Sequence, residues 1–256
     1  MMPLAHGWIH SVCIGIALLA PTVASGGTVY WNMNDLTTPT SNAVSNLTVS
    51  PLSQGNTTTT GGTTTSVSSG YTFLLNSATT TASGSFNLIF SAKSGTLDTG
   101  SSSYMAVTLT PAAGYSGTVN AIGIGSRSTA TGPTTLSLRS SADGYAADVA
   151  SFSPSTTSNW AYFTNSFVNP VQFSSSSPLT LRLYGSGGAS VTSGNWRIDD
   201  LQLDVVVVPE PAAVVLGMLA VAGVTIRVRR SGRWRRKRVP QYGDHQPVLR
   251  SSNCSS

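Results

Sequence analysis

The sequence predicts an all-β protein, an antiparallel two-sheet β-sandwich of jelly-roll type. Short runs rich in β-branched and aromatic residues recur between Gly, Ser, Thr and Asn turns, and helical periodicity is hard to find. Apolar and polar residues alternate within several runs, as expected for antiparallel strands with one face on a core. About ten such runs lie in residues 26–208, enough to bury a core without disulfides. A right-handed parallel β-helix is the alternative, although no fixed repeat supports it.

The expected strands share β-branched or aromatic residues in runs bounded by turn formers. They cover 28–33, 43–49, 71–76, 85–92, 104–110, 118–125, 134–140, 160–167, 179–184 and 196–207. Alternation is clear in the run 179–184, where Leu179, Leu181 and Leu183 would share one face of the sheet. Trp31 and Trp196 lie in the first and last runs, and we expect both to face the core.

The net charge of +5 would suggest a nucleic-acid-binding protein, but the charges are separated along the chain. Residues 26–208 hold five basic and seven acidic side chains, a net −2, whereas the chain from 209 onward holds nine basic and two acidic ones, a net +7. Phosphate binding requires positive charge spread over a folded face. The distribution therefore argues against nucleic acid as a partner.

Residues 26–208 contain no Cys, His or Glu, because these residue types are confined to the two ends of the chain. The domain therefore lacks the ligands of a Cys/His metal site and the base of a Ser-His-Asp triad or a Cys-His pair. Internal disulfides are excluded as well. We expect a protein that is not an enzyme and has no catalytic residues.

Residues 1–25 are expected to be a secretory signal peptide. The apolar run 12–20 is too short to span a bilayer, and Pro21 and several small residues follow it. Cleavage is expected after Ala24 or Ser25. The first residues include His6 and His10 but no Lys or Arg, and an uncleaved buried strand is the alternative.

The C-terminal region combines a Pro-Glu-Pro motif, an apolar run and a basic cluster. The uncharged run 212–226 would form a helix of roughly 22 Å, shorter than the roughly 30 Å hydrocarbon core of a bilayer. Snorkelling of the flanking arginines and local thinning of the bilayer can close that difference. We expect a single transmembrane helix, with a buried core helix as the alternative.

The basic cluster is expected to stay in the cytoplasm, which leaves the β domain outside. Its members are Arg227, Arg229, Arg230, Arg233, Arg235, Arg236, Lys237 and Arg238. A nucleic-acid patch that includes Trp234 is the alternative, but a position directly after an apolar run favours an anchor attracted to anionic headgroups.

The segment 209–238 resembles the PEP-CTERM sorting signal of exosortase substrates, in which the same three parts occur in this order. The resemblance implies that Pro209, Glu210 and Pro211 are recognised by a membrane processing enzyme of the exosortase type. It also implies export, transient tethering to the inner membrane, and release or attachment at the cell surface or in the extracellular matrix, alongside exopolysaccharide. Unlike these signals, the chain continues through residues 239–256, which we expect to be a disordered tail.

Parts of the domain 26–208 are similar to the jelly-roll modules common in PEP-CTERM proteins. The segments 137–150 and 194–205 resemble the late strands of such modules, where a W-x-I-D-D sequence and a following hydrophobic residue close the sandwich. The segment 29–36 resembles their opening strand. This resemblance implies the fold and an extracellular setting, and it carries no catalytic motif.

Asp199 and Asp200 are the best carboxylate pair in the sequence. Neighbouring side chains of a regular strand point to opposite faces, which argues against the facing carboxylates of a glycosidase. The expected role of one of them is an ion pair with Arg139, Arg182 or Arg197, or a turn.

Calcium is the functional alternative for these carboxylates, and no other cofactor is expected. Carboxylates and backbone carbonyls suit a hard cation, and jelly-roll sandwiches often carry a structural calcium. Asp35, Asp199 and Asp200 would contribute ligands if the first and last strands are neighbours.

Two tyrosines lie in sequences typical of loops, Tyr115 in AAGYSG and Tyr145 in ADGYAA. An exposed aromatic ring can stack on a sugar, so both are candidate ligand-binding residues. The alternative is that each fills its own turn.

These observations predict an exported structural or adhesive protein of the cell surface or extracellular matrix, processed through its PEP-CTERM-like signal. The alternative function is a carbohydrate-binding jelly-roll module, with or without bound calcium. A secreted hydrolase that uses aspartates alone is disfavoured by the missing His, Glu and Cys.

Overall fold

The computed structural model describes most of the chain between residues 24 and 210. The described residues are 24–33, 39, 41–56, 63–64, 67–82, 87–91, 95–157, 159–189 and 194–210. The apolar run 212–226, the basic cluster, the tail 239–256 and residues 1–23 of the expected signal peptide lie outside them.

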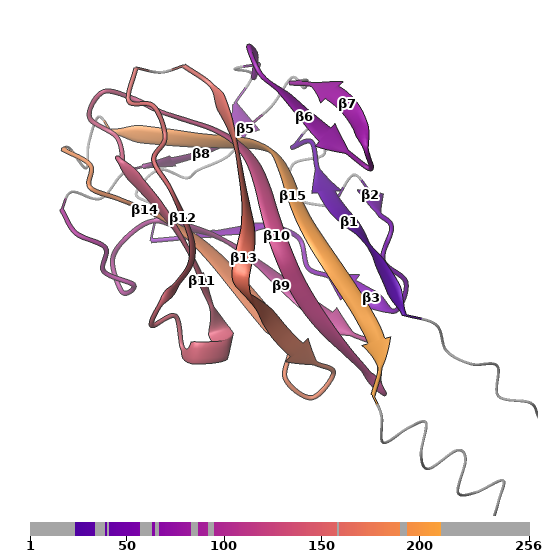
Figure 1. The fold of residues 1–256 in the computed structure, drawn as a ribbon. Coiled ribbons are helices and arrows are strands. Elements are labelled where there is room, and N and C mark those ends of the chain that lie inside the picture. The colour runs from indigo at the N-terminus through magenta and orange to yellow at the C-terminus, as the bar shows by residue number, and fades with distance from the viewer. Residues whose placement is uncertain are drawn as a thin grey trace, which may run out of the picture. The chain divides into compact units, whose positions relative to one another are not determined.

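The strands form two main antiparallel sheets, of which sheet A is built around the long strand β15 (Figure 1). Strand β10 pairs with one side of β15, and β1 and β8 pair with the two halves of its other side. The strands of sheet A are β13 (Ala161–Ser174), β10 (Tyr115–Ser128), β15 (Asn195–Pro209), β1 (Ser25–Trp31), β2 (Ser41–Asn42), β8 (Asn87–Ser91) and β5 (Thr63–Thr64).

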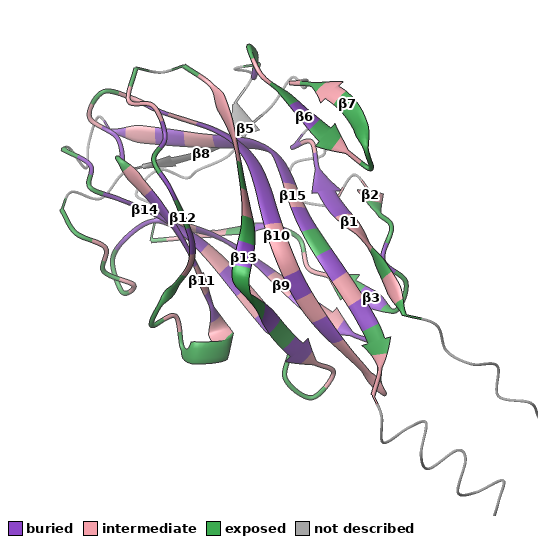
Figure 2. Cartoon of the chain, viewed as in Figure 1, coloured by how far each residue is buried: buried purple, intermediate pink, exposed green. Residues whose placement is uncertain are grey.

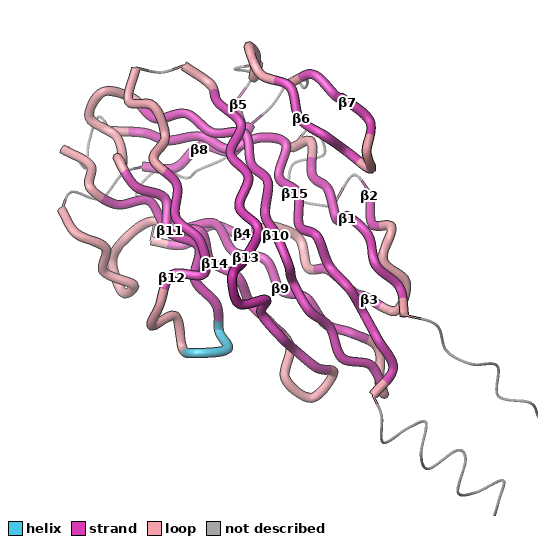
Figure 3. The backbone as a smooth tube through the Cα atoms, viewed as in Figure 1, coloured by secondary structure: helices cyan, strands magenta, loops and turns pink. Residues whose placement is uncertain are grey.

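Sheet B lies on the other side of the core (Figure 3). Its strands are β12 (Asp148–Phe152), β11 (Thr135–Ser140), β14 (Leu179–Ser186), β9 (Tyr104–Pro111), β3 (Leu47–Val49) and β4 (Ser53–Gly55). A short 3-10 helix, η1 (Ser141–Asp143), connects β11 to the loop before β12. A separate hairpin consists of β6 (Thr72–Leu75) and β7 (Ala78–Thr81).

The antiparallel β-sandwich predicted from the sequence is confirmed, and the parallel β-helix is wrong, because every strand pairing in the described residues is antiparallel. Each expected strand has a counterpart, although β10 and β13 extend well beyond the expected runs 118–125 and 160–167. The expected run 43–49 is divided between a turn and β3. Five short strands, β2, β4, β5, β7 and β12, were not predicted. Polar sequences without alternation form the first four of them.

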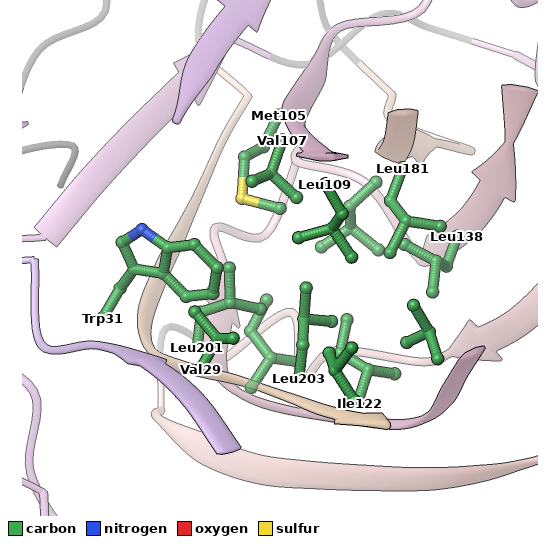
Figure 4. Packing of buried hydrophobic residues seen from close by; sticks show 14 of the residues in the cluster. Val29, Trp31, Met105, Val107, Leu109, Ile122, Leu138, Leu181, Leu201 and Leu203 are labelled. Atoms are coloured by element: carbon green, nitrogen blue, oxygen red, sulfur yellow. The ribbon is translucent and has the colours of Figure 1, made fainter. Parts of the chain in front are cut away.

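The core is formed by the inward faces of the two sheets, as Figure 4 shows for fourteen of its residues. Val29 and Trp31 of β1 lie beside Leu201 and Leu203 of β15, and side chains of β9, β11 and β14 face them. Trp31 and Trp196 are fully buried, which confirms the expected place of both. Burial alternates along most strands, and Figure 2 shows this as changing colours on β15 and β10.

The beginning of β1 and the end of β15 lie side by side. Ser25 is the register partner of Val207, and the backbone N–H of Glu210 donates to the carbonyl oxygen of Gly114. Both ends of the described chain therefore leave from the same end of sheet A. The described residues include no helix with the length and hydrophobicity of a membrane span.

Candidate functional site

The outer face of sheet B, turned away from the core, carries a stack of aromatic and cationic side chains. The guanidinium carbon of Arg182 lies 4.5 Å from the ring centroid of Tyr104 and 4.1 Å from that of Tyr145. Arg182 comes from β14, Tyr104 from β9 and Tyr145 from the loop after η1. We call these three residues the stacked column. All three side chains are half-buried, so the column is partly open to solvent.

The alternation of β9 and β14 explains how these residues meet. Leu181 and Leu183 face the core, so Arg182 between them points outward, and Tyr104 sits diagonally opposite on β9. Behind Tyr104 lies Gly55 of β4, where a β-carbon would overlap with the tyrosine ring. The absence of a side chain at Gly55 therefore allows the ring to lie against the sheet.

The loop that carries Tyr145 is fixed by three charged residues. Arg139 forms a 2.7 Å ion pair with Asp148 and donates from an NH1 group to the carbonyl oxygen of Tyr145 at 3.0 Å. The carboxylate of Asp143 accepts from the backbone N–H groups of residues 146 and 147. Tyr145 itself has a left-handed φ of 65°. These contacts hold Tyr145 beside Arg182 before any ligand arrives.

Arg182 retains donors that a ligand could use. Its NH1 group donates to the Tyr184 hydroxyl at 3.2 Å, and Tyr184 packs at 5.2 Å from the Tyr104 ring. Its Nε is enclosed and has no hydrogen-bond partner among the described residues. A guanidinium has five N–H donors, so three remain besides the enclosed Nε and the one bound to Tyr184. Half-exposed rings beside such a donor suit a ring-shaped polar ligand.

The two candidate tyrosines have different surroundings. Tyr145 lies in a loop, as predicted, and its ring belongs to the stacked column. Tyr115 does not lie in a free loop, and that prediction was wrong: it begins β10 and packs half-buried against the core. Arg182 and Tyr104, which the sequence placed in alternating strands, were not singled out as candidates. Their meeting depends on the pairing of β9 with β14.

The outer face of sheet A holds a second, enclosed cluster around Asp199 and Asp200. The register between β10 and β15 shifts between Gly123 and Gly125, which inserts an extra residue into β15. Asp200 adopts a left-handed φ of 47° there. Because this β-bulge interrupts the alternation, the two carboxylates do not point to opposite faces, contrary to the expectation for a regular strand.

Tyrosine hydroxyls enclose the carboxylate of Asp200. Tyr30 donates to its Oδ1 at 2.5 Å and Tyr71 donates to its Oδ2 at 2.7 Å. Burial comes first among the causes that raise the pKa of both hydroxyls, and the interactions with Asp200 raise it further. Both aspartates are fully buried. A buried carboxylate that accepts hydrogen bonds from two tyrosine hydroxyls is suited to hold the segments that carry them together.

Aromatic rings cover this cluster and link the β6–β7 hairpin to sheet A. Phe73 of β6 stacks on Tyr162 of β13 at 4.9 Å and lies 6.0 Å from Tyr30 of β1. Tyr71 stacks on Tyr162 at 5.6 Å. Below them a β-carbon at Gly125 would overlap with the Tyr71 hydroxyl, so this glycine makes room for the rings.

Asp199 differs from Asp200 in its partners. Its Oδ1 accepts from the backbone N–H of Asp200 at 2.8 Å, whereas its Oδ2 has no hydrogen-bond partner among the described residues. Burial, and then the charge of Asp200, raise the pKa of Asp199 to about 8, while contacts with Ser68 and the Asp200 N–H act in the opposite direction. This carboxyl therefore holds its proton at neutral pH.

The expected ion pair of these aspartates is not found among the described residues. Arg139 pairs with Asp148 instead, and Arg182 belongs to the stacked column. Asp200 accepts its hydrogen bonds from the hydroxyls of Tyr30 and Tyr71. For calcium, Asp35 lies outside the described residues, and those described contain no group of three or more His, Cys, Asp or Glu placed to hold a metal. A calcium site that includes Asp35 stays a prediction.

The expected sorting residues lie at the boundary of the described chain. Pro209 is the last residue of β15, and Glu210 follows it with its N–H bound to Gly114. Pro211 and the basic cluster lie outside the described residues. The role of this segment in sorting stays a prediction.

The fold and the stacked column define a β-sandwich domain with an aromatic and polar outer face. No protein-family model matches the chain, and no curated protein matches it.

Several solved structures show a distant likeness. The adhesin domain of Lys-gingipain from Porphyromonas gingivalis W83 is 10% identical with a TM-score of 0.38, over 70% of this chain and 98% of that one. The CBM36-1 domain of a xylanase from the hindgut metagenome of Trinervitermes trinervoides is 16% identical with a TM-score of 0.31, over 62% and 96%. A family 29 carbohydrate-binding module from Piromyces equi is 11% identical with a TM-score of 0.32, over 71% and 90%. These values are too low to transfer a ligand or a role to this chain.

Proposed function

We propose that the protein is a non-catalytic carbohydrate-binding module whose binding surface is the outer face of sheet B. The observation that carries this proposal is the stacked column of Tyr104, Arg182 and Tyr145. Aromatic rings offer a flat apolar surface for the C–H face of a sugar, and the Arg182 donors suit its hydroxyl oxygens.

Preorganisation of the face supports the same proposal. Arg139, Asp143 and Asp148 fix the loop of Tyr145 through an ion pair and backbone hydrogen bonds. A loop that is already ordered loses little conformational entropy when a ligand binds, so more of the contact energy appears as affinity.

The experiment is a screen of the purified protein on a glycan array, followed by calorimetry with the best neutral oligosaccharide. Tyr145→Ala is expected to weaken binding by tenfold or more, since a ring buried by direct contact contributes about 1.5–3 kcal/mol. Tyr115→Ala, which removes a half-buried tyrosine at the start of β10 in sheet A, is the matched control and leaves the affinity unchanged. Full affinity in Tyr145→Ala, or turnover of the sugar that is lost in an Asp199→Asn variant, would contradict the proposal.

Export and sorting form the second part of the proposed function. The Pro-Glu-Pro motif begins at the last residue of β15, Pro209, and the N–H of Glu210 donates to the carbonyl oxygen of Gly114. In this proposal an exosortase-type enzyme processes the chain near the motif, and the module reaches the cell surface or extracellular matrix.

Intact-mass analysis of the native protein from envelope and medium tests this part. The expected released form starts at Ser25 or Gly26 and lacks the basic cluster. A released form that retains every residue through Ser256 would rule out the sorting proposal and leave the carbohydrate-binding proposal untouched.

A further inference from the structure

Arg182 has a second arginine directly opposite it on the neighbouring strand of sheet B. Arg139 of β11 and Arg182 of β14 are register partners. Both side chains point to the outer face, since their neighbours Leu138 and Leu181 face the core. Like charges directly opposite each other on paired strands repel. How each of the two charges is offset therefore decides what this face can bind.

The charge of Arg139 is offset within the protein. Its Nε donates to Oδ1 of Asp148 at 2.7 Å, and Oδ2 of the same carboxylate accepts from the hydroxyl of Ser137 at 3.0 Å. Asp143 is engaged as well, because its two carboxylate oxygens accept from the backbone N–H groups of residues 146 and 147. Both carboxylates near the stacked column therefore already have partners at each oxygen.

Arg182 has no such counter-charge. Its hydrogen bond and ring contacts in the described part of the chain involve Tyr104, Tyr145 and Tyr184, all of which are uncharged side chains. Among the described residues it forms no ion pair. A ring attracts a cation through its quadrupole but does not neutralise it. Arg139, Arg182 and Asp148 together therefore carry one positive charge in excess on the outer face.

The two rings also fix the direction from which a ligand can reach Arg182. Its guanidinium carbon lies over both rings, at 4.5 Å and 4.1 Å, and its Nε is enclosed. The three remaining N–H groups belong to NH1 and NH2, and the N–H bonds of a guanidinium lie in its plane. An acceptor must therefore approach from the edge, where a planar group with two oxygens can meet both nitrogens at once.

We propose that Arg182 binds the carboxylate of a uronic acid residue, so that the ligand of the stacked column is an acidic polysaccharide. This inference rests on the proposed function, since it names the class of sugar that the column takes. A sugar hydroxyl can accept from the same donors but leaves the excess charge in place, whereas a carboxylate accepts from the donors and neutralises the charge. Neutral glycans bind the same rings more weakly.

The rest of the outer face favours a polysaccharide over a polyphosphate. The next outward pair along β14 and β9 is Thr180 and Thr108, whose hydroxyl oxygens lie 2.9 Å apart and carry no charge. Residues 26–208 as a whole carry a net charge of −2. A polyphosphate requires a row of cations along its path, whereas a carboxylate flanked by sugar hydroxyls requires one cation and neutral hydrogen-bonding groups beside it.

The test is calorimetry of the full chain with oligogalacturonate, oligoguluronate and oligoglucuronate, each compared with its carboxyl-reduced neutral counterpart. At least one acid is expected to bind about tenfold more tightly than its counterpart. Arg182→Gln is expected to remove most of this preference. Arg182→Lys keeps the charge without the planar pair of donors and is expected to retain part of it. Thermal unfolding checks that each variant folds, and Arg182→Lys alone decides if Arg182→Gln does not.

Arg235→Gln is the matched control, because it removes the same charge from the C-terminal basic cluster and is expected to leave the preference unchanged. A preference that survives in Arg182→Gln and is lost in Arg235→Gln would assign it to the basic cluster and overturn the inference. Absence of binding by all three acids, or equal binding of each acid and its counterpart, would overturn it as well. If Tyr145→Ala still weakens the binding of a neutral glycan, the proposed function stands without this inference.

Discussion

On sheet A, tyrosine hydroxyls enclose the carboxylate of Asp200, whereas on sheet B tyrosine rings flank the guanidinium of Arg182 and leave it half-exposed. Both faces combine tyrosines with a charged residue, but the hairpin β6–β7 covers only the first. Once such a charge is enclosed, its hydrogen bonds hold strands together. The half-exposed guanidinium of Arg182 instead keeps hydrogen-bond donors for a ligand.

The largest effect is expected from removal of the enclosed carboxylate. Asp200→Ala leaves the hydroxyls of Tyr30 and Tyr71 without their acceptor and places alanine at a left-handed φ, so we expect a loss of about 3–5 kcal/mol in the free energy of unfolding. Urea unfolding measures it. Asp200→Asn, which tolerates this φ and keeps one acceptor, should lose clearly less. A loss below about 1 kcal/mol in Asp200→Ala would mean that the cluster does not hold the hairpin.

The second-largest expected effect is a dependence of the free energy of unfolding on pH. It arises in the enclosed cluster on sheet A and not in the stacked column on sheet B. The pKa of Asp199 is raised to about 8 in the folded chain from 3.8 in the unfolded chain, so the folded state binds this proton more tightly. The protonated Asp199 therefore contributes fully to the free energy of unfolding below about pH 4, and this contribution is lost as the pH rises to about 8. The slope approaches about 1.4 kcal/mol per pH unit between these values.

Asp199→Asn tests that assignment, because the amide keeps an oxygen for the Asp200 N–H and cannot ionise. Urea unfolding between pH 5.5 and 8.5 should show a falling stability for the wild type and a much flatter profile for the variant. Parallel profiles would mean that another group causes the pH dependence.

The smallest effect is expected when either of two glycines is replaced by alanine. One glycine lies beside the enclosed cluster on sheet A, and the other lies beside the stacked column on sheet B. At Gly125 a β-carbon meets the Tyr71 hydroxyl inside the enclosed cluster, and at Gly55 it meets the Tyr104 ring of the open column. Gly125→Ala should cost about 1–3 kcal/mol, because nothing there can move aside. Gly55→Ala should cost less than about 1 kcal/mol and mainly weaken glycan binding. Equal stability losses would show that the two faces are packed alike.

Alternation of apolar and polar residues predicted most of the long strands and the core. It placed Leu179, Leu181 and Leu183 on one face, and it assigned Trp31 and Trp196 to the interior, as the structure confirms. A strand with one buried face leaves a pattern of period two in the sequence, whatever its partners are. Short polar strands such as β5 and β7 leave no such pattern.

The surroundings of Asp199 and Asp200 could not be predicted in the same way. The expectation that the two carboxylates point to opposite faces assumed a regular strand, and a β-bulge breaks that assumption. The donors come from Tyr30 and Tyr71, which are 170 and 129 residues away from Asp200 in the sequence. A loop tyrosine such as Tyr145 was recognisable as a candidate, but its arginine partner was not.

The sequence by itself determined the fold class, the buried tryptophans and the absence of His, Cys and Glu from residues 26–208, because these follow from composition and from the period of single strands. Only the tertiary structure decided which charges are enclosed and which stay open. Strand pairing, a β-bulge and the β6–β7 hairpin bring together residues that are far apart in the chain. The residue pattern within one strand cannot predict such contacts.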